Sequence, residues 1–335
     1  MTRLYNGPMP IADGPPVSVL PGTGAKQHTL ANSVRCSGVG LHCGDPIAVR
    51  MHPAPADTGV RLRRADVPNA PPIQANWANV RETPLCTTLA DGVTQIATVE
   101  HLLAALAAMG VDNADVEVHG PEVPIMDGSA APFVFLIECA GRAPQQAARR
   151  AIRIEKPVTV HDTAQDRSAA LAPGSNGLTL DVTIAFNSPA IGQQARTARL
   201  DAHTFKRDLA RARTFGFLAE VDQLRAVGLA LGGSLDNAVV IDDDRVLNTE
   251  GLRYPDEFVR HKMLDSVGDL FLAGAPIMGR YTGRRTGHAL NRRLLAALFA
   301  DPEAWSWIDD PGDTRHEAVH GAGPALPERA VAQRE

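Results

Sequence analysis

The stretch Phe258-Val-Arg-His-Lys-Met-Leu-Asp-Ser-Val-Gly-Asp-Leu-Phe271 predicts one helix with two different faces. Pro255 stands at a position that favours a helix start, and Gly274 can end the helix. At about 100° per residue, the helix has an apolar arc along one side. The residues of that arc are Met263, Leu264, Val267, Leu270 and Phe271. The opposite side carries a polar stripe of His261, Asp265 and Asp269.

The spacing of the polar stripe leaves two interpretations open. A polar face in contact with solvent is the more common origin of a lone His-x-x-x-Asp pair. Alternatively, His261 and Asp265 lie one turn apart and offer an imidazole nitrogen and a carboxylate oxygen to one metal ion. Spacing alone does not decide between a solvated face and a metal site.

The composition is that of a globular protein with room for two domains. The chain has 335 residues, of which 44% are hydrophobic and 21% are charged. This length allows two domains, each with its own core. The net charge of -5 argues against a broad nucleic-acid-binding surface, so no nucleic-acid partner is expected.

The cysteines and the apolar segments indicate the compartment. Four cysteines, Cys36, Cys43, Cys86 and Cys139, include no CxxC pair, so neither a zinc knuckle nor a disulfide framework is predicted. Free thiols fit a reducing cytoplasm. No signal peptide and no stretch able to span a bilayer is apparent. We therefore expect a cytoplasmic monomer without a transmembrane segment.

Proline and glycine divide the chain into segments. Residues 1–26 are rich in both and are expected to form a disordered extension. Residues 309–335 are expected to form a flexible tail. The basic, Ala-rich connector 141–150 marks a boundary between domains 27–145 and 146–308.

Both halves place predicted strands before a helix that carries ionisable residues. Strands are expected at 29–51, 59–64, 95–98, 112–118, 151–160 and 178–186, and further helices at 132–139 and 202–213. This pattern suits an α+β fold of two similar two-layer α/β sandwich domains packed face to face.

A second unusual helix is predicted from Thr98 to Met109, ended by Gly110, with Thr98 as its cap. It is apolar nearly all round, so it should be buried. Glu100 and His101 are its only ionisable residues. A buried charge is costly unless it is neutralised, paired or bound to metal, although a helix end that reaches solvent would also explain the pair.

If His101, His261 and Asp265 converge, they supply three ligands of the kind found in catalytic zinc sites. Zinc lowers the pKa of a bound water to about 7. Glu100, beside a ligating histidine, can then take the proton from that water as it attacks a carbonyl. One metal site thus accounts for both unusual helices.

A metal hydrolase also needs an oxyanion donor and an acid for the leaving group. Thr214 offers a hydroxyl to the oxyanion. His288, after a glycine, can protonate an amine, with Asp269 orienting its ring and Lys262 adding positive charge nearby. Taken singly, each of these assignments is weak, since a lone histidine after glycine is more often a turn residue.

Six motifs together resemble one family in order and spacing, from about Gln27 to Trp307. They are Thr98-Val-Glu-His101, Ile125-Met-Asp-Gly-Ser-Ala-Ala-Pro-Phe133, Arg211 to Phe217, Leu231-Gly-Gly-Ser234, Glu257-Phe-Val-Arg-His-Lys-Met-Leu-Asp265 and Gly287-His-Ala-Leu-Asn291. The resemblance is to the LpxC family, the UDP-3-O-acyl-N-acetylglucosamine deacetylases of lipid A synthesis.

The resemblance implies a zinc-dependent deacetylase that removes acetate from the glucosamine nitrogen, the committed step towards lipid A in Gram-negative bacteria. It implies zinc ligation by His101, His261 and Asp265, with ferrous iron as the alternative ion in the cell. The same resemblance implies Glu100 as general base, His288 as general acid, Thr214 at the oxyanion, and Asp269 and Lys262 in support. The implied fold is two α/β sandwich domains, each with an insert, with the active site at their interface.

For substrate binding, the resemblance points to Phe215 near the sugar and Phe186 near the uridine of a UDP-linked acylated amino sugar. Segment 218–233 resembles the family's acyl-chain insert, although on its own it would read as an amphipathic helix end. The residues implied to line the passage are Val221, Leu229, Ala230 and Gly233, with Leu85 and Cys86 in a loop on the hexose side. Ala185 departs from the family pattern, since an Asp often precedes the nucleotide-side Phe.

Two other functions compete with the deacetylase. A non-haem iron oxygenase also uses two histidines and one carboxylate, but its site needs neither Glu100 nor His288, and oxygen consumption with ferrous iron would identify it. A nonenzymatic RNA-binding sandwich would need a basic stripe, and salt-sensitive RNA binding would identify it.

Overall fold

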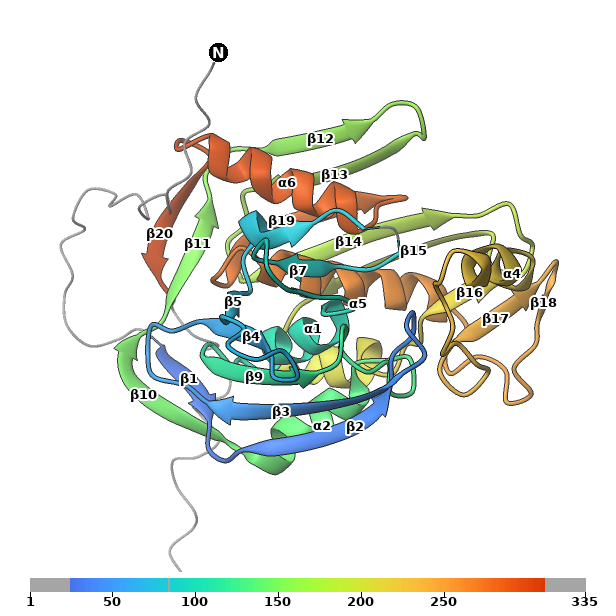
Figure 1. Ribbon diagram of the computed structural model, residues 1–335. Coiled ribbons are helices and arrows are strands. Elements are labelled where there is room, and N and C mark those ends of the chain that lie inside the picture. Colours follow the sequence, from blue (N-terminus) through green and yellow to red (C-terminus); the bar gives the residue numbers. More distant parts are fainter. Residues whose placement is uncertain (1–24, 84, 311–335) are drawn as a thin grey trace, which may run out of the picture.

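The computed structural model describes residues 25–83 and 85–310 and shows a mixed α and β protein, as predicted (Figure 1). The strands up to residue 148 are β1 (Lys26–Leu30), β2 (Val34–Val39), β3 (Pro46–Pro53), β4 (Val60–Arg64), β5 (Ile73–Gln74), β6 (Val80–Arg81), β7 (Thr88–Ala90), β8 (Gln95–Ile96), β9 (Ala114–His119) and β10 (Arg142–Ala148). The helices of this part are α1 (Glu100–Ala108) and α2 (Ala131–Ala140), with a short 3₁₀ helix at Trp77–Asn79.

The strands up to residue 148 form three sheets. The largest has the order β2-β3-β9-β4-β5, in which only the β4–β9 pair is parallel. A small antiparallel sheet has the order β6-β7-β8, and β1 pairs antiparallel with β10.

The chain from residue 150 onward forms two further sheets. The strands of this part of the chain are β11 (Arg150–Ile154), β12 (Val158–Asp162), β13 (Arg167–Ala172), β14 (Leu178–Ala185), β15 (Gln193–Arg199), β16 (Phe215–Phe217), β17 (Val239–Asp242), β18 (Arg245–Val246), β19 (Ile277–Arg284) and β20 (Trp305–Asp309). Its helices are α3 (Ala202–Thr204), a π-helical turn at Phe205–Leu209, α4 (Leu218–Ala226), α5 (Glu257–Phe271) and α6 (His288–Ala300). Seven strands form one sheet, in the order β12-β13-β19-β11-β20 with β14 between β19 and β15, and β16-β17-β18 form another.

Helices α1 and α5 lie against each other in the centre of the molecule, between the sheet of β3 and β9 and the sheet of β14 and β19 (Figure 1). In strand β14, the buried residues Leu180, Val182 and Ile184 alternate with less buried ones. Because successive side chains of a strand point to opposite faces, one face of its sheet packs against the core. Helix α1 is buried at every residue except Ala107, as its apolar sequence predicted. The core therefore encloses the two helices with ionisable residues.

The predicted helix around 258–271 is confirmed as α5, which begins at Glu257. Its C-terminus is closed where the Gly274 N–H donates to the Phe271 carbonyl (3.0 Å). The helix predicted at 132–139 is confirmed as α2. The helix predicted at 202–213 is shorter, since helical backbone ends near Leu209.

One local prediction is wrong. Thr98 does not cap α1, because its φ is 54° and its hydroxyl donates instead to Glu122 Oε2 (2.8 Å). Val99 stands at the cap position, without a side-chain hydrogen bond. Most of the expected connector 141–150 forms strand β10, which is hydrogen-bonded to β1, and the domain boundary placed there stays a prediction.

Regular structure extends slightly into the two terminal segments that were expected to be disordered or flexible. Strand β1 already begins at Lys26, inside the expected extension 1–26, and β20 continues to Asp309, inside the expected tail 309–335. Residues 1–24 and 311–335 lie outside the described residues. No helix in the described part of the chain is both long enough and apolar enough to cross a membrane.

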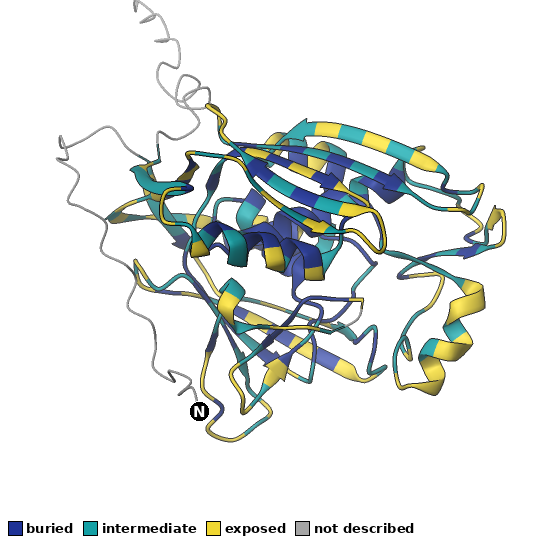
Figure 2. Ribbon diagram, turned by 90° about the horizontal axis from the view of Figure 1, so that it is seen from above, coloured by how far each residue is buried: buried dark blue, intermediate teal, exposed yellow. Residues whose placement is uncertain are grey.

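Segment 218–233 begins with α4, which has no buried residue and projects beside β16 and β17 (Figures 1 and 2). The C-terminal end of segment 218–233 is hydrogen-bonded to the loop that contains Leu41 and His42. Leu231 N–H donates to the His42 carbonyl (3.2 Å), and Gly232 N–H donates to the Leu41 carbonyl (3.1 Å). The segment therefore connects two parts of the molecule that are distant in sequence.

Candidate metal and active site

The close approach of α1 and α5 depends on Gly268. A Cβ at this position would lie 2.1 Å from the carbonyl oxygen of Glu100, so only a residue without a side chain lets the two backbones come this near. The contact brings the first turn of α1, with Glu100 and His101, beside the polar stripe of α5.

That stripe is buried rather than solvated. His261 is 2% exposed, Asp265 4% and Asp269 3%. The ligand atoms of His101, His261 and Asp265 all lie within 4.8 Å of one another. The structure thus brings together the three residues that the sequence predicted as metal ligands, and the solvated-face interpretation is wrong.

The chemistry of these donors suits a cation. Asp265 Oδ1 is buried, accepts no hydrogen bond, and lies 3.3 Å from His261 Nε2 and 3.6 Å from His101 Nε2. His261 Nδ1 lies 3.0 Å from the Ala212 carbonyl, to which its N–H can donate, so Nε2 keeps its lone pair. An orphaned carboxylate oxygen between two imidazole nitrogens is the arrangement that a metal ion would satisfy.

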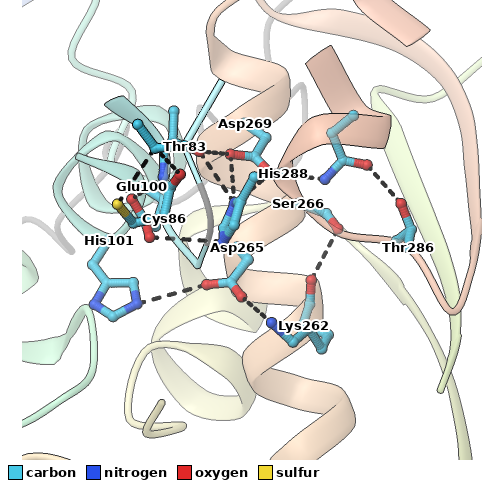
Figure 3. Close-up of polar contacts among 12 residues, drawn as sticks. Thr83, Cys86, Glu100, His101, Lys262, Asp265, Ser266, Asp269, Thr286 and His288 are labelled. Carbon is cyan, nitrogen blue, oxygen red and sulfur yellow. Dashed lines mark hydrogen bonds and ion pairs between the residues drawn. The ribbon is translucent and has the colours of Figure 1, made fainter. Parts of the chain in front are cut away.

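The charges around the donors favour an ionised Asp265 and a neutral His261. Burial lowers the pKa of His261 to about 3, so the ring is uncharged at neutral pH. Burial would raise the pKa of Asp265, but the positive charge of the neighbouring Lys262 opposes it, and that pKa is held well below its usual range. Lys262 Nζ donates to Asp265 Oδ2 (3.0 Å), as Figure 3 shows.

Glu100 and His288 form a second pair beside the donors (Figure 3). His288 begins α6, and its Nε2 lies 3.7 Å from Glu100 Oε1. Its Nδ1 lies 2.9 Å from Asp269 Oδ2. The structure therefore places the predicted base, the predicted acid and the predicted orienting carboxylate in one connected group.

The surroundings shift the pKa values of this pair. Burial, together with the negative charge of Asp265, raises the pKa of Glu100. Burial alone would lower the pKa of His288, but the carboxylates of Asp269 and Glu100 raise it to about 10. A histidine that stays protonated at neutral pH is able to donate a proton.

Thr214 and Phe215 stand at the start of β16, and Phe215 reaches one of the three metal-ligand candidates. Thr214 precedes β16, and its N–H donates to the Gly128 carbonyl (2.8 Å). Phe215 packs edge-on against His261, with ring centroids 6.2 Å apart, and against Phe186 at 5.6 Å. Phe186 and Phe215 are thus close together, as the prediction that they bind one substrate requires.

A cavity of about 230 Å³ opens beside Phe186 and is bordered by three cationic side chains. Lys262 was predicted as a functional residue, whereas Arg167 and Arg285 were not. The two arginines lie far apart in sequence, and neither belongs to a motif with a chemical signature. Ala185 also lines the cavity.

The predicted lining residues of segment 218–233 do not border this cavity. Val221, Leu229, Ala230 and Gly233 are partly exposed and lie on or after α4. Leu85 is exposed, and Cys86 is buried beside Thr88. The roles of these six residues stay predictions.

Comparison with known proteins identifies the family. Residues 27–300 match the family described as LpxC, UDP-3-O-acyl N-acetylglycosamine deacetylase. The chain belongs to the LpxC family. This match confirms the family that the six motifs of the sequence suggested.

Three LpxC relatives, each named UDP-3-O-acyl-N-acetylglucosamine deacetylase, show how much of the chain is shared. The protein of Acidithiobacillus ferrooxidans is 49% identical over 286 residues, which cover 85% of this chain and 93% of the relative. The protein of Thioalkalivibrio sulfidiphilus is 47% identical over 301 residues, or 89% of this chain and 98% of the relative. That of Marinobacter nauticus is 48% identical over 285 residues, or 84% and 93%.

Proposed function

We propose that the protein is a zinc-dependent hydrolase that converts UDP-3-O-acyl-N-acetylglucosamine and water into UDP-3-O-acyl-glucosamine and acetate, the committed step of lipid A biosynthesis. The names of its relatives support the reaction. The observation that carries the proposal is the buried group of His101, His261 and Asp265, with Glu100 and His288 beside it. A metal-binding group next to an acid–base pair is what amide hydrolysis needs.

His101, His261 and Asp265 would hold the ion. Two imidazoles and one carboxylate are usual zinc ligands, and ferrous iron is the alternative ion in the cell. When bound, a divalent ion supplies Lewis-acid chemistry, because it lowers the pKa of a coordinated water to about 7 and polarises the amide carbonyl. The Ala212 carbonyl orients His261 through Nδ1.

The chain's own residues would then move two protons. Glu100 takes one proton from the water as its oxygen attacks the acetyl carbonyl. The C–N bond breaks as His288 gives a proton to the leaving amine, while Asp269 holds the imidazole through Nδ1. In this proposal Thr214 donates its hydroxyl to the oxyanion, and Lys262 adds a nearby positive charge.

The cavity beside Phe186 would take the nucleotide. Arg167, Lys262 and Arg285 border it, and a diphosphate carries the negative charge that three cations attract. Phe186 offers an aromatic face near the uridine, and Phe215 lies towards the sugar because it also contacts His261. We assign UDP to this cavity on the basis of charge and aromatic packing.

The acyl chain would leave the site along segment 218–233. Its partly exposed apolar residues include Val221, Leu229 and Ala230, and Gly233 follows them. The loop with Leu85 and Cys86 would close the hexose side. Acyl chains pack against apolar surfaces, which is the support that this part of the proposal has.

The division into domains 27–145 and 146–308 is also a proposal. Among the described residues, no pair of strands joins a strand before residue 149 to one after it, and β10 (Arg142–Ala148) continues three residues past the proposed boundary. The contact of α1 with α5 would then be the interface at which two similar α/β sandwiches pack face to face. We further propose a cytoplasmic monomer.

Metal analysis joined to a deacetylation assay on UDP-3-O-acyl-N-acetylglucosamine tests the function. We expect about one zinc per chain, and acetate release that a chelator abolishes and zinc restores. Glu100→Gln should keep the metal and lose most turnover, whereas His261→Ala should lose both. Full acetate release by Glu100→Gln would refute the assignment of the base, and oxygen consumption with ferrous iron in place of acetate release would favour an oxygenase.

A further inference from the structure

Thr87 is a buried residue to which the sequence assigned no role, and it lies between the two proposed proton-transfer groups. It precedes β7 and is 2% exposed. Its backbone is fixed on the start of α1, because its carbonyl accepts from Val99 N–H (3.3 Å) and its own N–H donates to Glu100 Oε2 (3.0 Å). Thr87 therefore holds one oxygen of the proposed base directly.

The side chain of Thr87 reaches α5. Its hydroxyl donates to Asp269 Oδ1 (2.6 Å) and lies 3.1 Å from His288 Nδ1. The other carboxylate oxygen of Asp269 accepts from Asn291 Nδ2 (2.8 Å) and lies 2.9 Å from His288 Nδ1. An ionised carboxylate only accepts hydrogen bonds, so the hydroxyl proton points to Asp269. Thr87 and Asn291 thus fix the two oxygens that orient the imidazole.

The two proton-transfer groups stand on different helices. Glu100 is on α1 and His288 is on α6, so their separation depends on contacts between elements that are far apart in sequence. Both groups must act on one amide, and a displacement of about 1 Å can cost about 100-fold in rate. A single residue that bonds to both sides would fix this separation.

We propose that Thr87 is a positioning residue that sets the proposed general base and the proposed general acid relative to each other, through its backbone N–H on one side and its hydroxyl on the other. The inference rests on the proposed roles of Glu100 and His288. It adds a residue to which no motif assigned a function, and it gives the hydroxyl a purpose distinct from packing.

Four variants separate the hydroxyl from the shape of the side chain. Thr87→Val keeps the shape and removes the hydroxyl, and Thr87→Ser keeps the hydroxyl. Thr87→Ala differs from Thr87→Ser by that oxygen alone, which preserves the comparison if the Val variant does not fold. Thr88→Val is the matched control, because Thr88 is 1% exposed and its hydroxyl bonds to Thr83 (2.8 Å) and contacts Cys86 Sγ (3.7 Å) rather than Glu100 or Asp269.

The measurements are kcat and KM for acetate release, zinc content, and thermal unfolding of the zinc-loaded protein. We expect Thr87→Val and Thr87→Ala to lower kcat about 10- to 100-fold with KM changed less than about threefold. Thr87→Ser and Thr88→Val should keep kcat within about threefold of the parent. A purely structural role would instead lower Tm and zinc content in proportion to activity.

Besides that structural outcome, two others would overturn the inference. One is a folded, zinc-loaded Thr87→Val or Thr87→Ala protein with kcat within about threefold of the parent. The other is a Thr87→Ser protein as slow as Thr87→Ala. Glu100→Gln and His288→Ala, assayed alongside, separate a failure of the proposed acid–base roles from a failure of the proposed role of Thr87. If they stay active, the proposed acid–base roles fail, and if they are inactive while Thr87→Val is active, only the role of Thr87 fails.

Discussion

Replacing Gly268 by alanine tests whether the backbone contact between α1 and α5 sets the site. A Cβ at Gly268 would lie 2.1 Å from the Glu100 carbonyl oxygen and 2.9 Å from its carbonyl carbon. Both are backbone atoms of a buried helix, so no flexible side chain can move aside. To restore an ordinary contact of about 3.4 Å, the start of α1 must move by about 1.3 Å.

The magnitudes of the competing effects decide the expected result. Alanine in a helix interior is favoured over glycine by about 1 kcal/mol, which alone would stabilise the variant. Overpacking against α1 costs about 1–3 kcal/mol. We therefore expect a free energy of unfolding that is unchanged or lowered by up to about 2 kcal/mol, but a loss of about 100-fold in kcat/KM, because Glu100 and His101 move with α1.

Urea unfolding, zinc content and acetate release measure these effects in one preparation. Gly216→Ala serves as a stability control, since a Cβ at Gly216 meets no atom within 4 Å. A Gly268→Ala protein that is more stable than the parent and fully active would refute the reasoning, because it would mean that α1 accommodates the methyl group without moving the site.

Three further predictions follow from the charges. Glu257→Gln should lower the free energy of unfolding in urea by about 3 kcal/mol, since this carboxylate is fully buried and accepts from Arg213 Nε (3.0 Å). Asp269→Asn should move the alkaline fall of kcat/KM to lower pH, because Asp269 helps raise the pKa of His288 to about 10 and the proposed acid must be protonated to act. Chelation should lower the Tm of the parent protein, measured by scanning calorimetry, but not that of Asp265→Ala. The first prediction is contradicted if Glu257→Gln is as stable as the parent, and the second if the alkaline limb of Asp269→Asn does not move. The third is contradicted if chelation shifts the Tm of Asp265→Ala as much as that of the parent.

Local patterns were sufficient to predict much of the fold. The apolar arc of α5 and the apolar sequence of α1 predicted both helices, because helical periodicity and propensity are properties of neighbouring residues. The cap at Thr98 failed since a tertiary hydrogen bond to Glu122 competes for its hydroxyl. The strand within 141–150 was not predicted because its partner strand, β1, lies at the other end of the first part of the chain.

The candidate site was predictable only where a motif marks it. His261 and Asp265 stand one turn apart, so the spacing marked them as a candidate pair of ligands while leaving the solvated face open. Arg167, Arg285 and Thr87 carry no such signal, because what joins them to the site is the fold. From the sequence alone, a threonine before a short strand is interpreted as a packing residue. The hydrogen bonds of Thr87 to Glu100 and Asp269 are visible only in the structure.

The balance of charge in the buried site argues that the protein is built around a cation. Glu100, Asp265 and Asp269 bring three carboxylates into the core, and Lys262 and a protonated His288 bring two positive charges. Burial makes each unpaired charge costly. The excess lies at Asp265, whose Oδ1 accepts no hydrogen bond and lies 3.3 Å from His261 Nε2 and 3.6 Å from His101 Nε2. A divalent ion held there would neutralise that oxygen and weaken the repulsion from Asp265 that adds to burial in raising the pKa of Glu100, so that metal binding and the ionisation of the proposed base would be linked.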